Sequence, residues 1–161
     1  MIQLREHQNT VVDILSKNRK GQIIVPTGGG KTMCMIEDAK KVSGTIVVVA
    51  PRILLAEQLS SEFLEILDNV SVMHVHSGET THFSSTKASD VYMWDLHTRG
   101  DKIIFTTYHS LHRIQESHIH VDTIYFDEAH NGIQKNFIEA VEWFSMCASR
   151  CYFFTATPKH S

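Results

Sequence analysis

Several features that would place a chain in a membrane or outside the cell are missing from this sequence. No run of apolar residues approaches the roughly 20 that an α-helix needs to cross a bilayer. The first residues, Met1–Arg5, lack the basic stretch followed by an apolar stretch that is typical of a secretory signal. We therefore expect a protein of the cell interior, cytoplasmic or in the nucleoid, that neither enters a membrane nor is secreted.

Cysteine is scarce, with only Cys34, Cys147 and Cys151 among 161 residues. All three lie in segments with the pattern of helix or strand, and their number is odd, so we predict buried free thiols in a reducing compartment. Cys147 and Cys151 are four residues apart, but the sequence has no second pair of ligands that would complete a structural zinc site. The sequence therefore disfavours structural zinc.

Histidine, by contrast, is abundant, with 11 residues, and several are near neighbours in the sequence. The neighbouring pairs are His74 and His76, His109 and His112, and His118 and His120. None of these pairs has a cysteine or a carboxylate at a spacing that is typical of metal sites. We therefore predict scattered histidines on the surface and in loops.

Excess positive charge is also lacking, because 15 lysines and arginines face 18 aspartates and glutamates, a net charge of −3. A surface that is basic throughout is excluded, although a local strip of basic side chains and backbone N–H groups can still bind phosphates. The apolar fraction of 42% and the charged fraction of 20% are those of a globular protein. Repeats, low-complexity tracts and linkers are absent, so we predict a single domain over residues 1–161.

Short apolar runs alternate with amphipathic stretches along the chain. The runs have the length of strands and are apolar on both faces, as strands buried between two layers of helices should be. They are Gln22–Val25, Thr45–Ala50, Ser71–Val75, Lys102–Thr106, Thr123–Phe126 and Cys151–Phe154. The helix-like stretches are Glu6–Lys17, Lys31–Lys41, Ile53–Leu67, Tyr108–Arg113 and Ile133–Phe144. This alternation predicts an α/β fold, a parallel β-sheet with helices on both faces.

One segment, His76–Asp101, breaks the alternation. It is rich in serine, threonine and glycine, and its sequence supports at most a short helix around Asp90–Leu96. A connection of this length is unusual in a compact domain, so we expect either a functional excursion or a mobile one.

A glycine-rich loop follows the first predicted strand and precedes a predicted helix. Gly28, Gly29 and Gly30 allow successive backbone N–H groups to point at one phosphate, and the helix directs its positive end at the same charge. Lys31 can reach the β- and γ-phosphates of a nucleotide, and the Thr32 hydroxyl can bind Mg²⁺. The strict phosphate-loop pattern has glycine where this chain has a valine, so an ordinary glycine turn is the alternative.

Two carboxylates, Asp127 and Glu128, follow the apolar strand Thr123–Phe126. The carboxyl ends of parallel strands open onto the ligand crevice, so we expect both carboxylates beside the glycine loop. Asp127 would hold Mg²⁺, directly or through water, and Glu128 would polarise the attacking water as a general base. A solvated acidic turn is the alternative, which the buried strand and the glycine loop disfavour.

Three segments, Pro26–Thr32, Asp127–His130 and Thr155–Pro158, resemble in order and spacing motifs I, II (in its DEAH form) and III of superfamily 2 helicases. The chain resembles the first RecA-like domain of these enzymes nearly end to end, and in that superfamily the position of Val25 is commonly not glycine. The resemblance implies a RecA-like P-loop NTPase fold, ATP and Mg²⁺ as cofactors, and a second RecA-like domain in cis that residues 1–161 do not contain.

The resemblance also assigns a role to individual residues. Arg5 and Gln8 would contact adenine, since a glutamine amide can donate to and accept from its edge. The other residues expected to bind ATP are Pro26, Thr27, Gly28, Gly29, Gly30, Lys31, Thr32 and His130. Catalysis falls to Lys31 and Glu128, Mg²⁺ binding to Thr32 and Asp127, and coupling between the two motor domains to Thr155 and Thr157.

Two further segments point to a polymer partner. Val49–Leu59 resembles motif Ia and Thr106–Leu111 resembles motif Ib, which in the superfamily line the groove for the nucleic-acid strand. Arg52, Thr106 and Thr107 offer a charge and two hydroxyls at strand ends, which suits backbone phosphates better than bases. Gly78 would serve the same groove. The alternative is that Arg52 only begins a helix and the threonines only favour a strand.

We therefore hypothesise a monomeric ATP-binding domain of a nucleic-acid-dependent ATPase, a helicase or translocase on DNA or RNA. Its hydrolysis should be weak alone, because an arginine supplied from across the cleft can contribute a factor of about 10³–10⁵ in rate. One alternative is the motor part of a type III-like restriction enzyme. Another is a nucleotide-binding interaction module that does not hydrolyse ATP. A small-molecule kinase would have no use for Thr155–Pro158.

Overall fold

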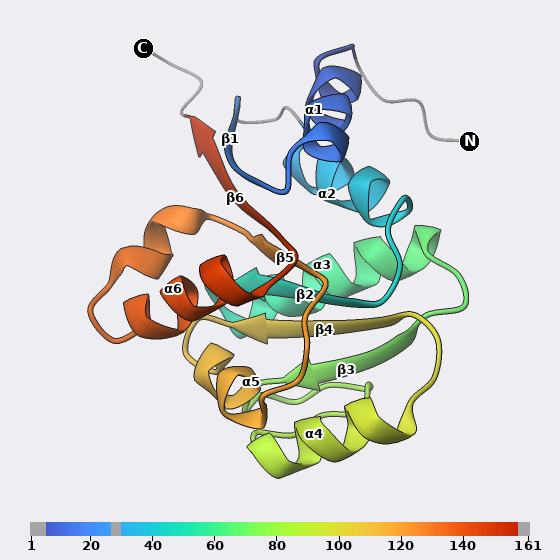
Figure 1. Ribbon diagram of the computed structural model, residues 1–161, viewed down its shortest axis with the longest axis vertical. Helices are drawn as coiled ribbons and strands as arrows, with labels where there is room; N and C mark the ends of the chain where they lie inside the picture. The colour runs from blue at the N-terminus through green and yellow to red at the C-terminus, as the bar shows by residue number, and fades with distance from the viewer. Residues whose placement is uncertain (1–5, 27–29, 158–161) are drawn as a thin grey trace.

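A parallel sheet of six strands forms the centre of the computed structural model, which describes residues 6–26 and 30–157 (Figure 1). The strand order is β1-β6-β5-β2-β4-β3, and every pairing is parallel. The strands are β1 (Lys20–Pro26), β2 (Thr45–Ala50), β3 (Ser71–Val75), β4 (Lys102–Thr107), β5 (Thr123–Phe126) and β6 (Arg150–Thr157). The predicted α/β class and parallel sheet are confirmed.

Helices cover both faces of the sheet (Figure 1). They are α1 (Glu6–Lys17), α2 (Lys31–Ala39), α3 (Ile53–Ile66), α4 (Ala88–His97), α5 (Leu111–Ser117), the 3₁₀ helix η1 (Ala129–Ile133) and α6 (Ile138–Cys147). One core cluster joins α1, α2 and α3 to one face of the sheet, and a second joins α4, α5 and α6 to the other. No helix of the described segments combines the length and apolarity needed to span a bilayer.

The central strand β2 shows why the sequence gives a sheet with two covered faces. Ile46, Val48 and Ala50 belong to the cluster under α1–α3, whereas Val47 and Val49 belong to the cluster under α4–α6. Every residue of β2 is buried. Because successive side chains of a strand point to opposite faces, a continuous apolar run buries area on both sides.

The carboxyl ends of all six strands lie along one edge of the sheet, because every strand runs in the same direction. β1 ends at Pro26, before the glycine loop, and β5 ends one residue before Asp127. The connections that contain Arg52 and Gly78 leave the same edge, after β2 and β3. β4 ends there at Thr107. The fold thus collects the predicted site residues at one edge, where ligands of open α/β sheets bind.

The bounds of β2, β3, β5 and α1 match the prediction, but other elements differ. β1 begins two residues earlier than predicted, and β6 continues beyond Phe154 to Thr157. The stretch predicted as a helix from Tyr108 becomes α5 only at Leu111, since the backbone N–H of Tyr108 still donates to Ala50 in β2. The stretch predicted as one helix over residues 133–144 divides into the end of η1 and α6.

The excursion after β3 is anchored to the sheet. The backbone N–H of His74 donates to Phe83, and that of Ser85 donates to His74, which forms a short parallel bridge on the outer edge of β3. The helix α4 follows, and Val91 on it is fully buried. The excursion therefore packs as part of the fold, and its helix is longer than the predicted Asp90–Leu96.

Two predictions about reactive side chains were wrong. Cys34 and Cys151 are buried as expected, but Cys147 is exposed at the end of α6. His74 and His76 are buried rather than on the surface, and both contact Glu57 on α3. Burial lowers the pKa of His74 to about 4. The local spacing of the histidines could not reveal a carboxylate that another element supplies.

A buried ion pair links α2 to β6 and had no signal in the sequence. Asp38 on α2 is fully buried, and Nη2 of Arg150 on β6 lies 2.7 Å from its Oδ1. The hydroxyl of Tyr125 on β5 donates to the other oxygen, Oδ2, at 2.5 Å. Arg150 also donates to the carbonyl of Leu15 in α1 at 3.2 Å. Both oxygens of the buried carboxylate therefore have donors, as a buried charge requires.

Candidate functional site

The helix α2 begins directly after the glycine loop. Gly30 is its N-cap and has φ 78° and ψ 40°, a left-handed conformation that glycine adopts without strain. The backbone N–H of Cys34 donates to the carbonyl of Gly30, which closes the first turn. Lys31 and Thr32 are the first residues of this helix. The strand and the helix predicted to flank the phosphate loop are therefore present, with β1 before residues 27–29 and α2 after them.

Some predicted site residues lie outside the described part of the chain. These are Arg5, Thr27, Gly28 and Gly29. Gln8 lies on α1, Pro26 ends β1 and Thr157 ends β6, but the side chains of these three residues are likewise outside the description. Their predicted roles stay predictions.

Lys31 meets both carboxylates that follow β5. Its Nζ lies 2.8 Å from Oδ1 of Asp127 and also contacts Oε1 of Glu128. Burial would lower the pKa of Lys31, but the neighbouring carboxylates of Asp127 and Glu128 outweigh it and raise the pKa. Lys31 therefore stays positively charged at neutral pH. The structure thus brings together a lysine and a carboxylate pair that are far apart in the sequence.

One oxygen of Asp127 is left without a hydrogen-bond donor among the described residues. Oδ1 is buried, and Lys31 approaches it as a charge without the direction of a hydrogen bond. Burial raises the pKa of Asp127, and Lys31 opposes that shift. An under-coordinated buried carboxylate oxygen at a phosphate loop is the group that Mg²⁺, or a water bound to it, would satisfy. The residues present therefore fit a magnesium site at Asp127.

Glu128 has an unusual backbone conformation. Its φ of 49° and ψ of 59° are left-handed, which is uncommon for a residue with a side chain. Its carbonyl accepts hydrogen bonds from the backbone N–H and the side-chain amide of Asn131, at 3.0 and 2.9 Å. The hydrogen bonds of this turn therefore hold Glu128, the predicted general base, in a backbone conformation that is unfavourable for a residue with a side chain.

Tyr108 holds the backbone of Asp127 and was missed by the sequence analysis. Its buried hydroxyl donates to the carbonyl of Asp127 at 2.8 Å, and the backbone N–H of Asp127 donates to Val49 in β2 at 2.8 Å. Burial raises the pKa of Tyr108, with the charges of Asp127 and Glu128 acting in the same direction, so the phenol keeps its proton. The segment with the likeness to motif Ib therefore contacts the acidic pair directly.

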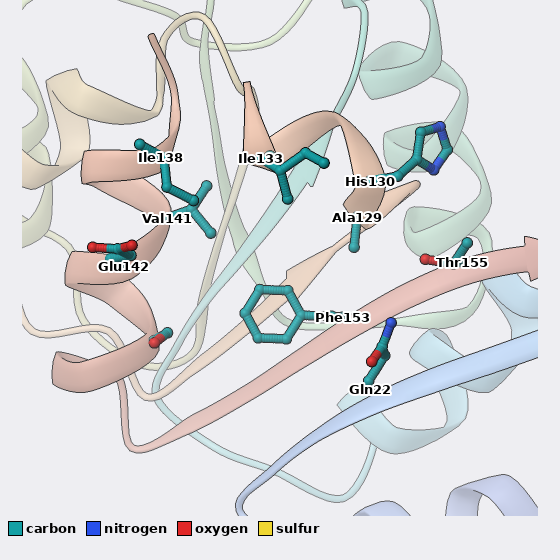
Figure 2. A pocket seen from close by; sticks show the side chains of 11 residues that line it. Gln22, Ala129, His130, Ile133, Ile138, Val141, Glu142, Phe153 and Thr155 are labelled. Carbon is teal, nitrogen blue, oxygen red and sulfur yellow. The ribbon is translucent and has the colours of Figure 1, made fainter. Parts of the chain in front are cut away.

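A cavity of about 510 Å³ lies between α6, η1 and the sheet (Figure 2). His130 and Thr155, from the segments that resemble motifs II and III, lie on one side of it, and Ile138 and Glu142 lie on the other. Phe153 contributes to its wall from β6. The structure thus places His130 beside Thr155 of the segment that resembles motif III, as well as next to the acidic pair.

The predicted nucleic-acid residues divide into two groups. Arg52 and Thr107 line one shallow cavity of about 290 Å³ at the carboxyl edge of the sheet, which Ser77 and His109 also line. Thr106 does not belong there, because it is fully buried and its hydroxyl donates to the carbonyl of Val75 at 2.7 Å. At this position of β4 the Thr106 side chain faces the neighbouring strand β3 and not the cavity. The resemblance alone could not indicate this orientation.

Gly78 lies beside the start of α3. A Cβ atom at this position would come within 2.7 Å of Cγ2 of Ile53, the residue after Arg52. The absence of a side chain therefore allows the connection after β3 to approach the first residue of α3.

The parallel sheet, with Lys31 at the start of α2 held against two carboxylates after β5, has the RecA-like fold of helicase domains. The chain belongs to the family described as Type III restriction enzyme, res subunit, whose model matches residues 1–160. The recognition of the superfamily from the sequence is confirmed.

One relative and two solved structures illustrate the similarity. The chain is 29% identical over 146 residues to "Putative helicase 7" of Sulfolobus islandicus filamentous virus (isolate Iceland/Hveragerdi), covering 88% of this chain and 23% of the viral protein. A nuclease-deletion mutant of the Type ISP restriction-modification enzyme LlaGI, in complex with a DNA substrate mimic, superposes with a TM-score of 0.80 and 20% identity. That match covers 94% of this chain and 15% of LlaGI.

The helicase domain of Hef from Pyrococcus furiosus superposes with a TM-score of 0.69 and 17% identity, covering 98% of this chain and 33% of that domain. At these identities the two structures establish the shared fold. The chain spans a third or less of the length of each of these proteins.

Proposed function

We propose that this chain is the first motor domain of a helicase or translocase that uses ATP and Mg²⁺ to move on DNA or RNA. The observation that carries the proposal is the contact of Lys31 with Asp127 and Glu128 at the carboxyl edge of the sheet. These three side chains come from the two segments that hold phosphates and metal in P-loop ATPases. Family membership and the likeness to helicase structures support it.

Each residue of this group has a distinct task in the proposed reaction. Lys31 has a flexible stem, so its ammonium can turn from the carboxylates to the β- and γ-phosphates. Thr32 and Asp127 would hold Mg²⁺, which neutralises phosphate charge. Glu128, more exposed than Asp127, would accept a proton from the attacking water. Gly30 and the preceding glycines would present backbone N–H groups to the phosphates.

The nucleic-acid strand would follow the edge of the sheet beside Arg52, Thr107 and Gly78. Arg52 is the N-cap of α3 and has an extended backbone, and it shares one shallow cavity with Thr107. Such groups contact backbone phosphate and leave the choice between DNA and RNA open. The DNA substrate mimic in the LlaGI complex supports DNA as one partner.

Movement would require a second RecA-like domain in cis. The relatives are several times longer than this chain, which leaves room for such a domain. Thr155 and Thr157 at the end of β6 would couple the two domains, and His130, which lines the same cavity as Thr155, would take part. A single copy of the chain suffices for this arrangement, so we propose a monomer.

The test is an ATPase assay with and without single-stranded and duplex DNA and RNA. It is made on the chain alone and on the longest natural polypeptide that contains it. We expect stimulation by at least one nucleic acid, and loss of activity in Lys31→Ala. Lys17→Ala is the matched control, since Lys17 pairs with Asp13 on an exposed surface. Absence of stimulation by every nucleic acid, in the longest polypeptide, would refute the proposal.

A second candidate is the motor of a restriction enzyme. The description of the family and the similarity to LlaGI favour it. Such an enzyme would cleave DNA in a reaction that depends on ATP. Cleavage of unmodified DNA by the natural polypeptide, abolished by Glu128→Gln, would support this candidate over a simple helicase.

A further inference from the structure

Three side chains that the proposed motor does not use converge on one point behind the nucleic-acid edge. Oε2 of Glu57 on α3 lies 2.5 Å from Nδ1 of His74 and 3.2 Å from Nε2 of His76. The two ring nitrogens are themselves 3.2 Å apart. Both histidine side chains are fully buried, and 29% of the Glu57 side chain is exposed.

We propose that Glu57, His74 and His76 form a binding site for one divalent transition-metal ion, with the ligand chemistry of Zn²⁺. Two imidazole nitrogens and one carboxylate oxygen are ligands that Zn²⁺ prefers. Zinc–ligand bonds of about 2.0–2.2 Å place tetrahedral ligand atoms about 3.3–3.6 Å apart, and two of the three separations, both 3.2 Å, are close to this range. The third is shorter, and the partly exposed carboxylate can widen it by rotation.

The surroundings of His74 suit a metal ligand. Its other ring nitrogen, Nε2, lies 2.9 Å from Oγ of Ser60 on α3. When Nδ1 binds the metal, Nε2 carries the ring proton and donates it to this hydroxyl. Such a partner fixes the orientation of the ring, as outer-shell acceptors do at most histidine-bound metals.

The surroundings of His76 predict a local change on binding. The backbone N–H of Gly78 donates to Nδ1 of His76 at 3.1 Å, so the ring proton is on Nε2, facing Glu57. A metal at Nε2 displaces that proton, and the neutral ring then carries its proton on Nδ1. The peptide between Ser77 and Gly78 must turn so that a carbonyl replaces the N–H, and glycine permits the new φ.

This change would reach the nucleic-acid edge. Gly78 packs against Ile53 at the start of α3, next to Arg52. The coupling to nucleic acid rests on the proposed function, whereas the metal site itself does not. If the motor proposal failed, metal binding would still be measured, and the two can be refuted separately.

The experiment titrates the 161-residue chain with Zn²⁺ and with Co²⁺. Cys147→Ser serves as the background, because this exposed thiol would bind metal by itself. Competition with a chromophoric chelator measures affinity and stoichiometry. We expect one ion for each chain with a Kd below about 1 μM, and Co²⁺ absorption typical of nitrogen and oxygen ligands in tetrahedral geometry.

Variants locate the ion. Glu57→Gln and His76→Asn should each weaken binding by at least about 100-fold, and Ser60→Ala, which keeps all three ligands, by about 10-fold. His120→Asn is the matched control, because His120 lies 3.3 Å from Asp122 but is exposed and has no third ligand among residues 6–26 and 30–157. Circular dichroism without metal checks that each variant is folded.

The same three side chains can also be satisfied by protons alone, with both ring N–H groups donating to Glu57. That arrangement predicts no saturable binding of Zn²⁺ or Co²⁺ and an unchanged melting temperature with either ion. This result, or equal affinity in Ser60→Ala, Glu57→Gln and the His120→Asn control, would overturn the metal site.

Discussion

The two ends of helix α2 carry charges of opposite sign, Lys31 at the amino end and Asp38 at the carboxyl end, and the two differ in burial. At its carboxyl end, both oxygens of Asp38 receive hydrogen bonds, from Arg150 at 2.7 Å and from Tyr125 at 2.5 Å. At its amino end, Lys31 approaches Asp127, one oxygen of which has no hydrogen-bond donor among the described residues. The protein therefore supplies a donor to each oxygen of Asp38, whereas one oxygen of Asp127 can still accept from, or bind to, a ligand.

This difference distinguishes an ion pair that supports the fold from one that is available for the proposed reaction. Desolvating a charge is costly, and a fold recovers that cost only if partners satisfy the remaining lone pairs. The side chain of Asp38 is 1% exposed, whereas those of Lys31 and Glu128 are 18% and 31% exposed. We therefore expect substitutions at the amino end to change activity and substitutions at the carboxyl end to change stability.

The largest effect is expected for Glu128→Gln, which should lower ATP hydrolysis by about 10²–10⁴-fold because it removes the proposed general base. Its free energy of unfolding should change by less than about 1 kcal/mol, since the contact between Lys31 and Asp127 remains. Steady-state hydrolysis and urea unfolding check the two halves of this prediction. If this variant hydrolysed ATP at the normal rate, the proposed catalytic role of the residues at the amino end of α2 would be contradicted.

Arg150→Met should lower the free energy of unfolding by about 3–5 kcal/mol, because it leaves the Asp38 carboxylate buried without its partner. Urea denaturation measures the loss. Lys17→Met is the control, because Lys17 pairs with Asp13 where both side chains are mostly exposed, 70% and 64%, and its loss should cost less than about 1 kcal/mol. Similar losses in the two variants would contradict the distinction drawn for Asp38.

Tyr108→Phe tests whether the backbone of the acidic pair needs its support. The change removes the hydrogen bond to the carbonyl of Asp127 and should cost about 1–3 kcal/mol, the penalty for a buried acceptor without a donor. We also expect a smaller stimulation of ATP hydrolysis by nucleic acid. Tyr92→Phe, at an exposed tyrosine on α4, is the control, and equal stimulation in both variants would place Tyr108 outside the coupling.

The smallest effect concerns the middle of α2, where Cys34 lies between the two charged ends. Burial raises the pKa of Cys34 to about 11 and that of Cys151 to about 12, so both thiols stay protonated at pH 8 and react slowly. Alkylation of the native chain, followed by mass spectrometry, should modify Cys147 alone. Rapid modification of Cys34 would show that α2 opens along its whole length.

The strands were the most predictable part of the fold. The bounds of β2, β3 and β5 agree with the sequence prediction because these runs are apolar on both faces and are followed, within three residues, by proline, glycine or aspartate. Lys31, Asp127 and Glu128 could also be singled out from the sequence, since each lies in a short segment whose residue types indicate its chemistry. Their meeting follows from the parallel sheet, which the alternation of elements had already predicted.

Contacts between distant elements were not predictable in this way. Asp38 and Arg150 are 112 residues apart, and Glu57 precedes His76 by 19, so no local spacing announces either pair. Thr106 shows a different limit. The resemblance placed it in the groove, but the alternation of side chains along β4 turns its hydroxyl to Val75.

The short bridge between His74 and Ser84 has a consequence for how copies of the chain meet. An uncovered strand edge is a template on which another chain can add a strand and begin aggregation. Here residues 83–85 occupy hydrogen-bonding positions of β3 that a second molecule would need. The excursion after β3 thus protects the chain from association through this edge of the sheet.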